Sequence, residues 1–141
     1  MDSTQSKSLE ISVGVRVGCT QSGEWSAMAK NGTYPLKEMP AFWRVVVLLE
    51  RTYHDVKSMF DKYGEESGLT TSFPYWKLVG AGLEFKTEQW ASLALNWVPE
   101  LTPQELLMLK AALENVADSK WASQKSRQLA NKFAKRVTPP H

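Results

Sequence analysis

A chain of 141 residues is close to the commonest size of a single domain and long enough to bury a hydrophobic core. Its content of 43% hydrophobic and 23% charged residues is that of an ordinary globular protein, and its longest apolar run, 45–49, is far too short to span a membrane. The polar start, without an apolar leader, and the single cysteine lead us to expect a cytoplasmic protein without disulfide bonds.

The charge is distributed unevenly along the chain. The net charge is only +2, but residues 1–118 carry 11 Lys and Arg against 15 Asp and Glu, whereas residues 119–141 carry six basic residues and no acid. A segment of this kind is attracted to a polyanion or to an acidic protein surface, or it is neutralised within an oligomer. The basic C-terminal segment is therefore the strongest functional clue.

The N-terminal pattern predicts β-structure. Apolar and polar residues alternate over 9–19, and this period of two predicts one half-buried strand on which Cys19 points inward with a buried thiol. A turn at 21–24 and a returning strand at 25–30 make an antiparallel hairpin, and Asn31-Gly32 marks the next turn. The edge of this hairpin is a place where the chain could form a homo-oligomer.

A helical period comes next along the chain. Apolar residues recur at intervals of three and four over 40–63, and Gly64 comes directly after them, which predicts one long amphipathic helix. Residues 65–72 predict a polar loop. After it, the pattern allows either a third strand over 79–85 or a short helix over 74–80.

The C-terminal half contains clear helix starts. Thr87 is placed to cap a helix that ends before the next proline. Thr102-Pro103-Gln104-Glu105 combines a capping box with a proline at the first helical position, and the helix it starts buries Leu106, Leu109, Leu113 and Val116. A final helix, capped by Asp118 or Ser119, runs to about Arg136.

These elements predict an α+β fold. We expect an N-terminal antiparallel β-hairpin, with room for a third strand, packed against about four α-helices, with a helical C-terminal half. No repeat or linker divides the chain, so 8–137 is predicted to form a single domain between disordered ends at 1–7 and 138–141.

The sequence offers little catalytic chemistry. It contains no P-loop, dinucleotide fingerprint, C-x-x-C, H-E-x-x-H or G-x-S-x-G motif. Glu50, His54 and Asp61 share one face of the predicted helix, but Arg51 and Lys57 lie beside them, and this mixture is typical of a solvated face of ion pairs. We therefore expect no enzyme, no metal site and no cofactor.

One short fragment resembles a known family. Residues 101–107, Leu-Thr-Pro-Gln-Glu-Leu-Leu, followed by Leu109, resemble the start of the helix-turn-helix domain of LuxR-type regulators, over less than a tenth of the chain. Those domains need a small-residue turn and a following scaffold helix, whereas residues 114–119 run straight into the last helix. The resemblance implies a short turn between two helices, the second of them basic.

The last helix carries the candidate nucleic-acid-binding residues. One face is lined by Lys120, Gln124, Arg127, Gln128, Asn131 and Lys135, and it is flanked by Lys125, Lys132 and Arg136. The opposite side presents Ala122, Leu129, Phe133 and Val137 to the domain. Lys and Arg neutralise phosphates, while Gln, Asn and Arg can read base edges. The helix macrodipole also favours basic residues at a helix C-terminus, which is the competing explanation.

Several of the six tryptophans bear on binding. Trp43, Trp90 and Trp97 fall on apolar stripes and are predicted to lie in the core. Trp25 and Trp76 are predicted to be partly exposed, where they could stack single-stranded bases or anchor a protein interface.

The sequence therefore predicts a small, non-catalytic, nucleic-acid-binding accessory or regulatory protein that contacts DNA or RNA through residues 119–136. The alternative is a protein–protein interaction module, such as an adaptor, an inhibitor or a subunit of a larger assembly, with no nucleic-acid contact. Neither interpretation involves a membrane.

Overall fold

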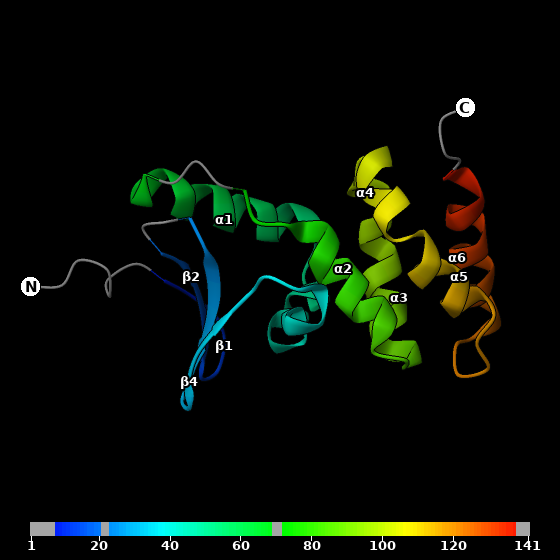
Figure 1. The fold of residues 1–141 in the computed structure, drawn as a ribbon, viewed down its shortest axis with the longest axis horizontal. Helices are drawn as coiled ribbons and strands as arrows, with labels where there is room; N and C mark the ends of the chain where they lie inside the picture. Colours follow the sequence, from blue (N-terminus) through cyan, green and yellow to red (C-terminus); the bar gives the residue numbers. More distant parts are fainter. Residues whose placement is uncertain (1–7, 21–22, 69–71, 138–141) are drawn as a thin grey trace, which may run out of the picture. The chain divides into compact units, whose positions relative to one another are not determined.

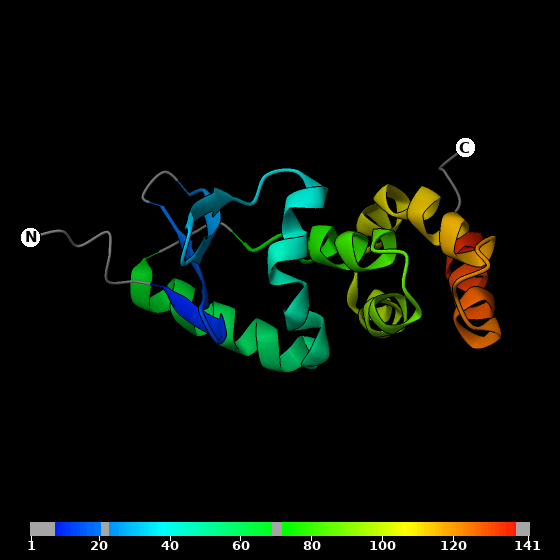
Figure 2. The same ribbon diagram turned by 90° about the horizontal axis from the view of Figure 1, so that it is seen from below.

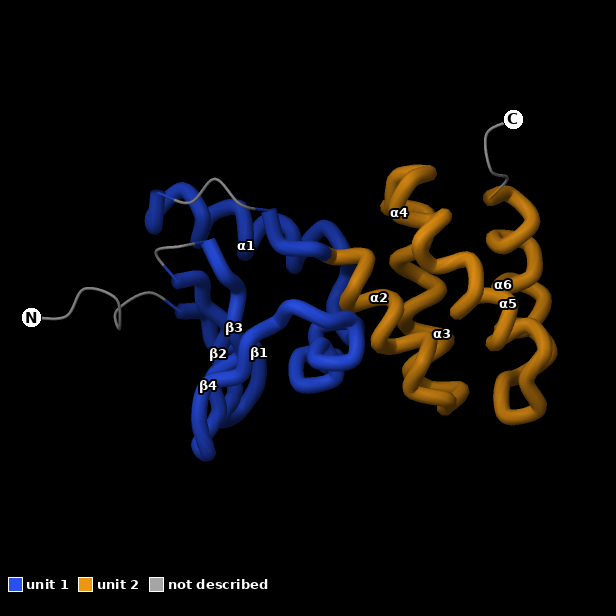
Figure 3. Tube along the Cα trace, in the orientation of Figure 1, with its two compact units in different colours: residues 1–74 blue, residues 75–141 orange. Residues whose placement is uncertain are grey.

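A computed structural model of the chain describes residues 8–20, 23–68 and 72–137. The chain divides between residues 74 and 75 into two compact units, which are described separately (Figure 3). The first unit contains an antiparallel sheet and the second is helical, which confirms the α+β class (Figure 1). The ends predicted to be disordered, 1–7 and 138–141, lie outside the described residues, and the single domain over 8–137 stays a prediction.

The sheet of the first unit has four antiparallel strands in chain order, β1 (Leu9–Ser12), β2 (Val15–Cys19), β3 (Trp25–Ala29) and β4 (Gly32–Pro35). The prediction of one strand over 9–19 is wrong, because the chain turns back at Val13 and Gly14. Gly14 adopts a φ of +78°, a left-handed conformation that glycine accepts without steric cost.

The rest of the hairpin prediction fits the structure. β3 is the expected returning strand, and the Thr20 N–H donates to the Glu24 carbonyl at 2.9 Å across the predicted turn, of which residues 21 and 22 lie outside the described residues. The turn predicted at Asn31-Gly32 leads into β4. The sheet thus gains its extra strands from β2 and β4, and not from 79–85 as the alternative prediction had it.

The helix predicted over 40–63 is two helices, the 3₁₀ helix η2 (Met39–Glu50) and the α-helix α1 (Tyr53–Ser67). Arg51 and Thr52 are extended, and the Thr52 hydroxyl accepts the Asp55 N–H at 3.1 Å, which starts a new helix with its own N-cap. Gly64 does not end α1. The helix runs on into the predicted polar loop and ends at Gly68, whose φ is +70°.

An aromatic cluster joins β3 to α1, the green helix along the lower edge of the first unit in Figure 2. The Trp25 ring centroid lies 5.6 Å from that of Phe60, 5.9 Å from that of Tyr63 and 5.3 Å from that of Phe73. The Tyr63 hydroxyl also accepts the Cys19 N–H at 3.0 Å. Trp25 is only 5% exposed, so the prediction that it lies partly at the surface is wrong.

The second unit consists of short helices, α2 (Tyr75–Glu84), α3 (Glu88–Trp97), η3 (Val98–Glu100), α4 (Pro103–Met108), α5 (Lys110–Ala117) and α6 (Gln124–Arg136). The strand predicted over 79–85 is wrong, and the competing helix is present and extends to Glu84. Because the predicted long helices are broken, the structure has more and shorter helices than the four expected.

Two helix starts are confirmed in detail. The Thr87 hydroxyl accepts the Trp90 N–H at 3.3 Å. The Thr102 hydroxyl accepts the Glu105 N–H at 3.1 Å, while the Glu105 carboxylate accepts the Thr102 N–H at 2.8 Å, which completes the capping box. The helix that this box starts is interrupted at Leu109, whose φ of −100° and ψ of 2° separate α4 from α5.

The core of the second unit is built mainly from leucines. Leu109, Leu113 and Val116 are buried as predicted, whereas Leu106 is half-buried. Of the tryptophans, Trp97 is buried as predicted, and Trp76 is half-buried and so partly exposed as predicted. Trp90 is half-buried instead of being fully in the core.

Trp43 of the first unit is 52% exposed, which contradicts the prediction that it lies in the core. Trp43 directly follows the buried Phe42, and one residue turns a helix by about 100–120°, so the Trp43 side chain leaves the side on which Phe42 is buried. Within 8–20, 23–68 and 72–137, every helix is too short or too polar to cross a lipid bilayer.

Candidate nucleic-acid interface

The basic helix α6 begins later than predicted. Ser123 is its N-cap, and the Ser123 hydroxyl accepts the Ser126 N–H at 3.1 Å. Asp118 and Ser119 instead end α5, because the Ser119 hydroxyl donates back to the Val116 carbonyl at 2.8 Å. Residues 118–123 therefore form a loop, and the candidate residue Lys120 lies in this loop and not on the helix.

Glu88 at the start of α3 fixes the N-terminus of α6. Its carboxylate accepts the Ser123 N–H at 2.7 Å, the Ser123 hydroxyl at 3.1 Å and the Ser126 hydroxyl at 3.0 Å. Desolvation raises the pKa of Glu88, but these hydrogen bonds together outweigh it and hold the pKa below its ordinary value. The charge also lies where the helix macrodipole favours an anion.

The two sides of α6 differ sharply. Its buried residues are Ser126, Ala130, Phe133 and Ala134. Of the predicted inward side, Ala122, Phe133 and Val137 are buried, whereas Leu129 is only half-buried. The outward side holds the candidate binding residues of the helix, all exposed except the half-buried Arg127, namely Gln124, Lys125, Arg127, Gln128, Asn131, Lys132, Lys135 and Arg136.

The basic side chains of this surface are not neutralised by acids. Elsewhere, Lys57 pairs with Asp61 at 2.7 Å and Lys37 with Glu24 at 3.0 Å. Among the described residues, no carboxylate lies within 4.0 Å of the side-chain nitrogens of any basic residue from 120 to 136. The Arg136 guanidinium lies 5.5 Å from the Phe133 ring centroid. The positive charge of α6 is therefore available to a ligand.

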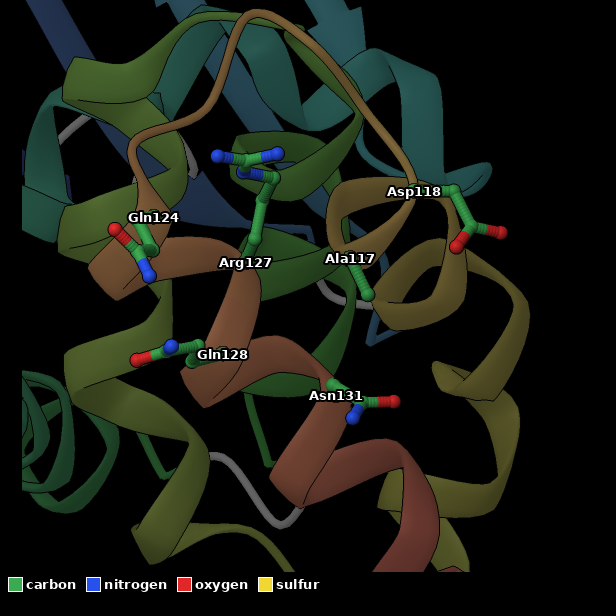
Figure 4. Close-up of a pocket in the computed structure, with 6 residues that line it drawn as sticks. All are labelled: Ala117, Asp118, Gln124, Arg127, Gln128 and Asn131. Carbon is green, nitrogen blue, oxygen red and sulfur yellow. The ribbon is translucent and has the colours of Figure 1, made fainter.

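A pocket of 410 Å³ lies where the loop after α5 meets α6 (Figure 4). It is lined by Ala117, Asp118, Gln124, Arg127, Gln128 and Asn131. The Arg127 side chain rises beneath the arch of the loop, and the Asp118 carboxylate points away from it. The Nε of Arg127 is buried and has no hydrogen-bond partner among the described residues. The pocket thus combines a guanidinium whose Nε has no acceptor among the described residues with three amide side chains.

The other candidate chemistry gives no site in the part of the chain that the structure describes. No cluster of three His, Cys, Asp or Glu residues suited to a metal ion is found there. The Lys57–Asp61 pair supports the interpretation of this helix face as solvated ion pairs, and its hydrogen bond raises the pKa of Lys57. Cys19 is half-buried and not fully buried as predicted, and desolvation, followed by the charge of Glu24, raises its pKa.

Sequence reasoning missed two features of this site. Glu88 contacts Ser123 and Ser126, which lie 35 and 38 positions further along the chain, so no local sequence pattern reveals its role. The true start of α6 does have a local signal, because Ser123 directly precedes the acid-free helical run and serine is a favoured N-cap.

No protein-family model, curated protein or solved structure matches the chain. The residues of the LuxR-type resemblance, 101–107, include the start of α4, whereas the turn before the basic helix α6 is the loop 118–123 that follows α5. Function must therefore be inferred from the geometry and charge of α6.

Proposed function

We propose that this protein is a small nucleic-acid-binding accessory or regulatory protein and that α6 is its contact surface. The observation that carries the proposal is the uncompensated charge of α6, which has five basic residues, no acidic residue and no carboxylate partner among the described residues. Such cations attract phosphates and gain free energy when the condensed counterions are released.

The helix macrodipole does not account for this charge. It favours cations only in the last turn, where Lys135 and Arg136 lie. Lys125 and Arg127 lie near the N-terminus of α6, where the macrodipole disfavours cations and where Glu88 supplies the stabilising anion from another helix. A helix face that serves only solubility usually interleaves Glu with Lys, and α6 does not.

The test is the binding of fluorescently labelled 20-nucleotide probes, measured by anisotropy at about 50 mM salt and repeated as the salt is raised. We expect binding that weakens with salt, with a slope of about −0.9 in log K against log[salt] for each phosphate contact on duplex DNA. Replacing Lys125, Lys132 and Lys135 together by Ala should remove most of the affinity. If no nucleic acid binds at low salt, the proposal is wrong.

A matched control separates a specific surface from general charge. Lys30, Lys62 and Lys86 are lysines outside α6, so their triple replacement by Ala changes the net charge by the same amount. This control variant should keep the affinity and slope of the unaltered protein. Equal losses in the two triple variants would show that α6 is not the contact surface.

A second candidate function, a protein–protein interaction module, is favoured by one feature of the first unit. The Arg44 guanidinium stacks 3.4 Å from the centroid of the Tyr34 ring and 4.7 Å from that of the half-exposed Trp43. Trp, Tyr and Arg dominate interface hot spots, and Tyr34 belongs to β4, an edge strand of the described sheet. Sedimentation equilibrium of the protein and of Trp43→Ala tests self-association, and a monomer in both excludes a second copy as the partner.

A further inference from the structure

We infer that the ligand of α6 is duplex DNA. Two stripes of side chains on the helix contact it in different ways: one contacts base edges in the major groove and the other contacts phosphates. The inference rests on the proposed function and adds to it the class of nucleic acid and the role of each side chain. Three features of α6 support it, which are the angular separation of its residue types, the composition of the pocket and the absence of exposed aromatic residues on this fully described helix.

The residue types separate around the helix axis. With about 100° of rotation per residue, Lys125, Lys132 and Arg136 fall within about 40° of one another and form a cationic stripe. Gln124, Gln128, Asn131 and Lys135 fall within about 60° and form a second stripe, centred about 90° from the first. A helix seated in a groove needs this arrangement, because the groove floor carries base edges and the groove wall carries phosphates.

The second stripe adjoins the pocket beside Arg127. Gln124, Gln128 and Asn131 line that pocket, and the Nε of Arg127 has no acceptor there among the described residues. A buried Nε without an acceptor is costly, which marks Arg127 as a polar group of this pocket whose hydrogen bonding is incomplete among the described residues. Arg pairs with O6 and N7 of guanine, and Gln and Asn pair with N6 and N7 of adenine.

Asp118 is the one acidic residue that lines the pocket, and its carboxylate points away from Arg127 (Figure 4). The cationic stripe has no such acid among the described residues. The cationic stripe is therefore the better position for phosphates, while the second stripe carries three amides and one lysine.

Duplex DNA is favoured over single strands because the outward side of α6, a fully described helix, has no aromatic residue. Proteins that bind single strands stack bases on aromatic rings, but Phe133, the one aromatic residue of this fully described helix, is buried. The major groove of A-form RNA is too narrow to admit side chains, whereas that of B-DNA admits a helix. Gln124 and Asn131 lie about 10 Å apart along the axis, which is the rise of about three base pairs.

The experiment compares duplex DNA, duplex RNA and single-stranded DNA of the same length and sequence at about 100 mM salt. We expect duplex DNA to bind at least about tenfold more tightly than the other two, a difference of about 1.4 kcal/mol. Binding of all three with equal affinity, or tighter binding of RNA or single strands, overturns the inference and leaves the proposed function standing. Binding of none of them at low salt refutes the proposed function itself.

Two matched double variants then test whether one stripe contacts phosphates and the other contacts bases. Lys125→Ala with Lys132→Ala should weaken binding to all duplex sequences alike and reduce the salt slope by about 1.8, at about 0.9 for each lost phosphate contact. Gln128→Ala with Asn131→Ala should leave that slope unchanged and reduce the sequence preference found by selection from a randomised duplex pool. If both variants change the slope and leave the preference intact, the assignment of the stripes is wrong.

Arg127 needs a gentler substitution because it is half-buried beneath the loop. Arg127→Lys keeps the charge but cannot form a bidentate pair with guanine. It should lower the preference for guanine-containing sites by about five- to tenfold with the salt slope unchanged, and circular dichroism would confirm that α6 is still folded. An unchanged preference would show that Arg127 does not contact bases.

Discussion

The contact between Glu88 and the start of α6 makes a sharp prediction about stability. Replacing Glu88 by Gln removes the charge of a carboxylate that accepts three hydrogen bonds at 2.7, 3.0 and 3.1 Å. A single hydrogen bond to a charged group contributes about 1.5–3 kcal/mol when buried, and a helix-terminal charge adds about 0.3–1 kcal/mol. Because Glu88 is only half-buried, solvent screening reduces the total, and we expect a loss of about 1–2 kcal/mol.

The stabilisation by Glu88 should depend on pH, and the direction of the pKa shift fixes how. The pKa of Glu88 in the folded protein is below its ordinary value of 4.5. The unfolded protein therefore takes up a proton at higher pH than the folded one, and the stabilisation is fully present above about pH 4.5 and is lost as the pH falls through the folded-state pKa. Glu88→Gln should thus be less stable at pH 7, and its difference from the unaltered protein should shrink at about pH 3.

Urea unfolding followed by circular dichroism at a series of pH values measures this difference. Glu114 is an exposed carboxylate in α5, so Glu114→Gln is the control and should differ from the unaltered protein by less than about 0.5 kcal/mol at any pH. A difference between Glu88→Gln and the unaltered protein that stays the same at neutral and acidic pH would refute the reasoning. It would show that the carboxylate charge is not what holds α6.

Three further changes test the packing. Trp25→Ala should lower the free energy of unfolding by about 3–5 kcal/mol, because Trp25 is 5% exposed in an aromatic cluster. Trp43→Ala, at a 52% exposed site, should lower it by less than about 1 kcal/mol. Urea unfolding measures both. Gly64→Ala should raise the melting temperature and stabilise α1 by about 0.5–1 kcal/mol, since a Cβ there meets no atom within 4 Å. Thr102→Ala should destabilise the protein by about 1 kcal/mol through loss of the capping box, and an unchanged melting temperature would contradict this.

The fold class could be predicted from periodicity, but the position of chain reversals could not. Leu9 pairs with Val17 and Glu10 with Arg16, so residues of the same character face each other across the turn at Gly14. Paired residues lie on the same face of a sheet, and the alternation of a hairpin therefore looks the same as that of one long strand. Only the φ of Gly14 distinguishes them, and glycine is also common within strands at bulges.

The helix interruptions have a similar cause. Arg51-Thr52 and Leu109 break helices in the middle of apolar patterns that fit an unbroken helix. Long-range contacts support the first of these breaks, since the Arg51 guanidinium donates to the Ile11 carbonyl at 3.2 Å. The basic surface was accessible to sequence reasoning because charge and helical spacing are local properties. The Glu88 contact and the isolation of Arg127 are tertiary properties, and they were not.

The shortness of α4 has a consequence for how the protein opens. None of the residues of α4, 103–108, all of which are described, is buried, and Leu107 and Met108 are 39% and 63% exposed. The helix is held by its capping box at one end and by the buried Leu109 just beyond the other. Local opening of so few contacts costs little free energy. The amides of α4 should therefore exchange with deuterium sooner than those of α5, and a protease should cut the second unit first at this helix.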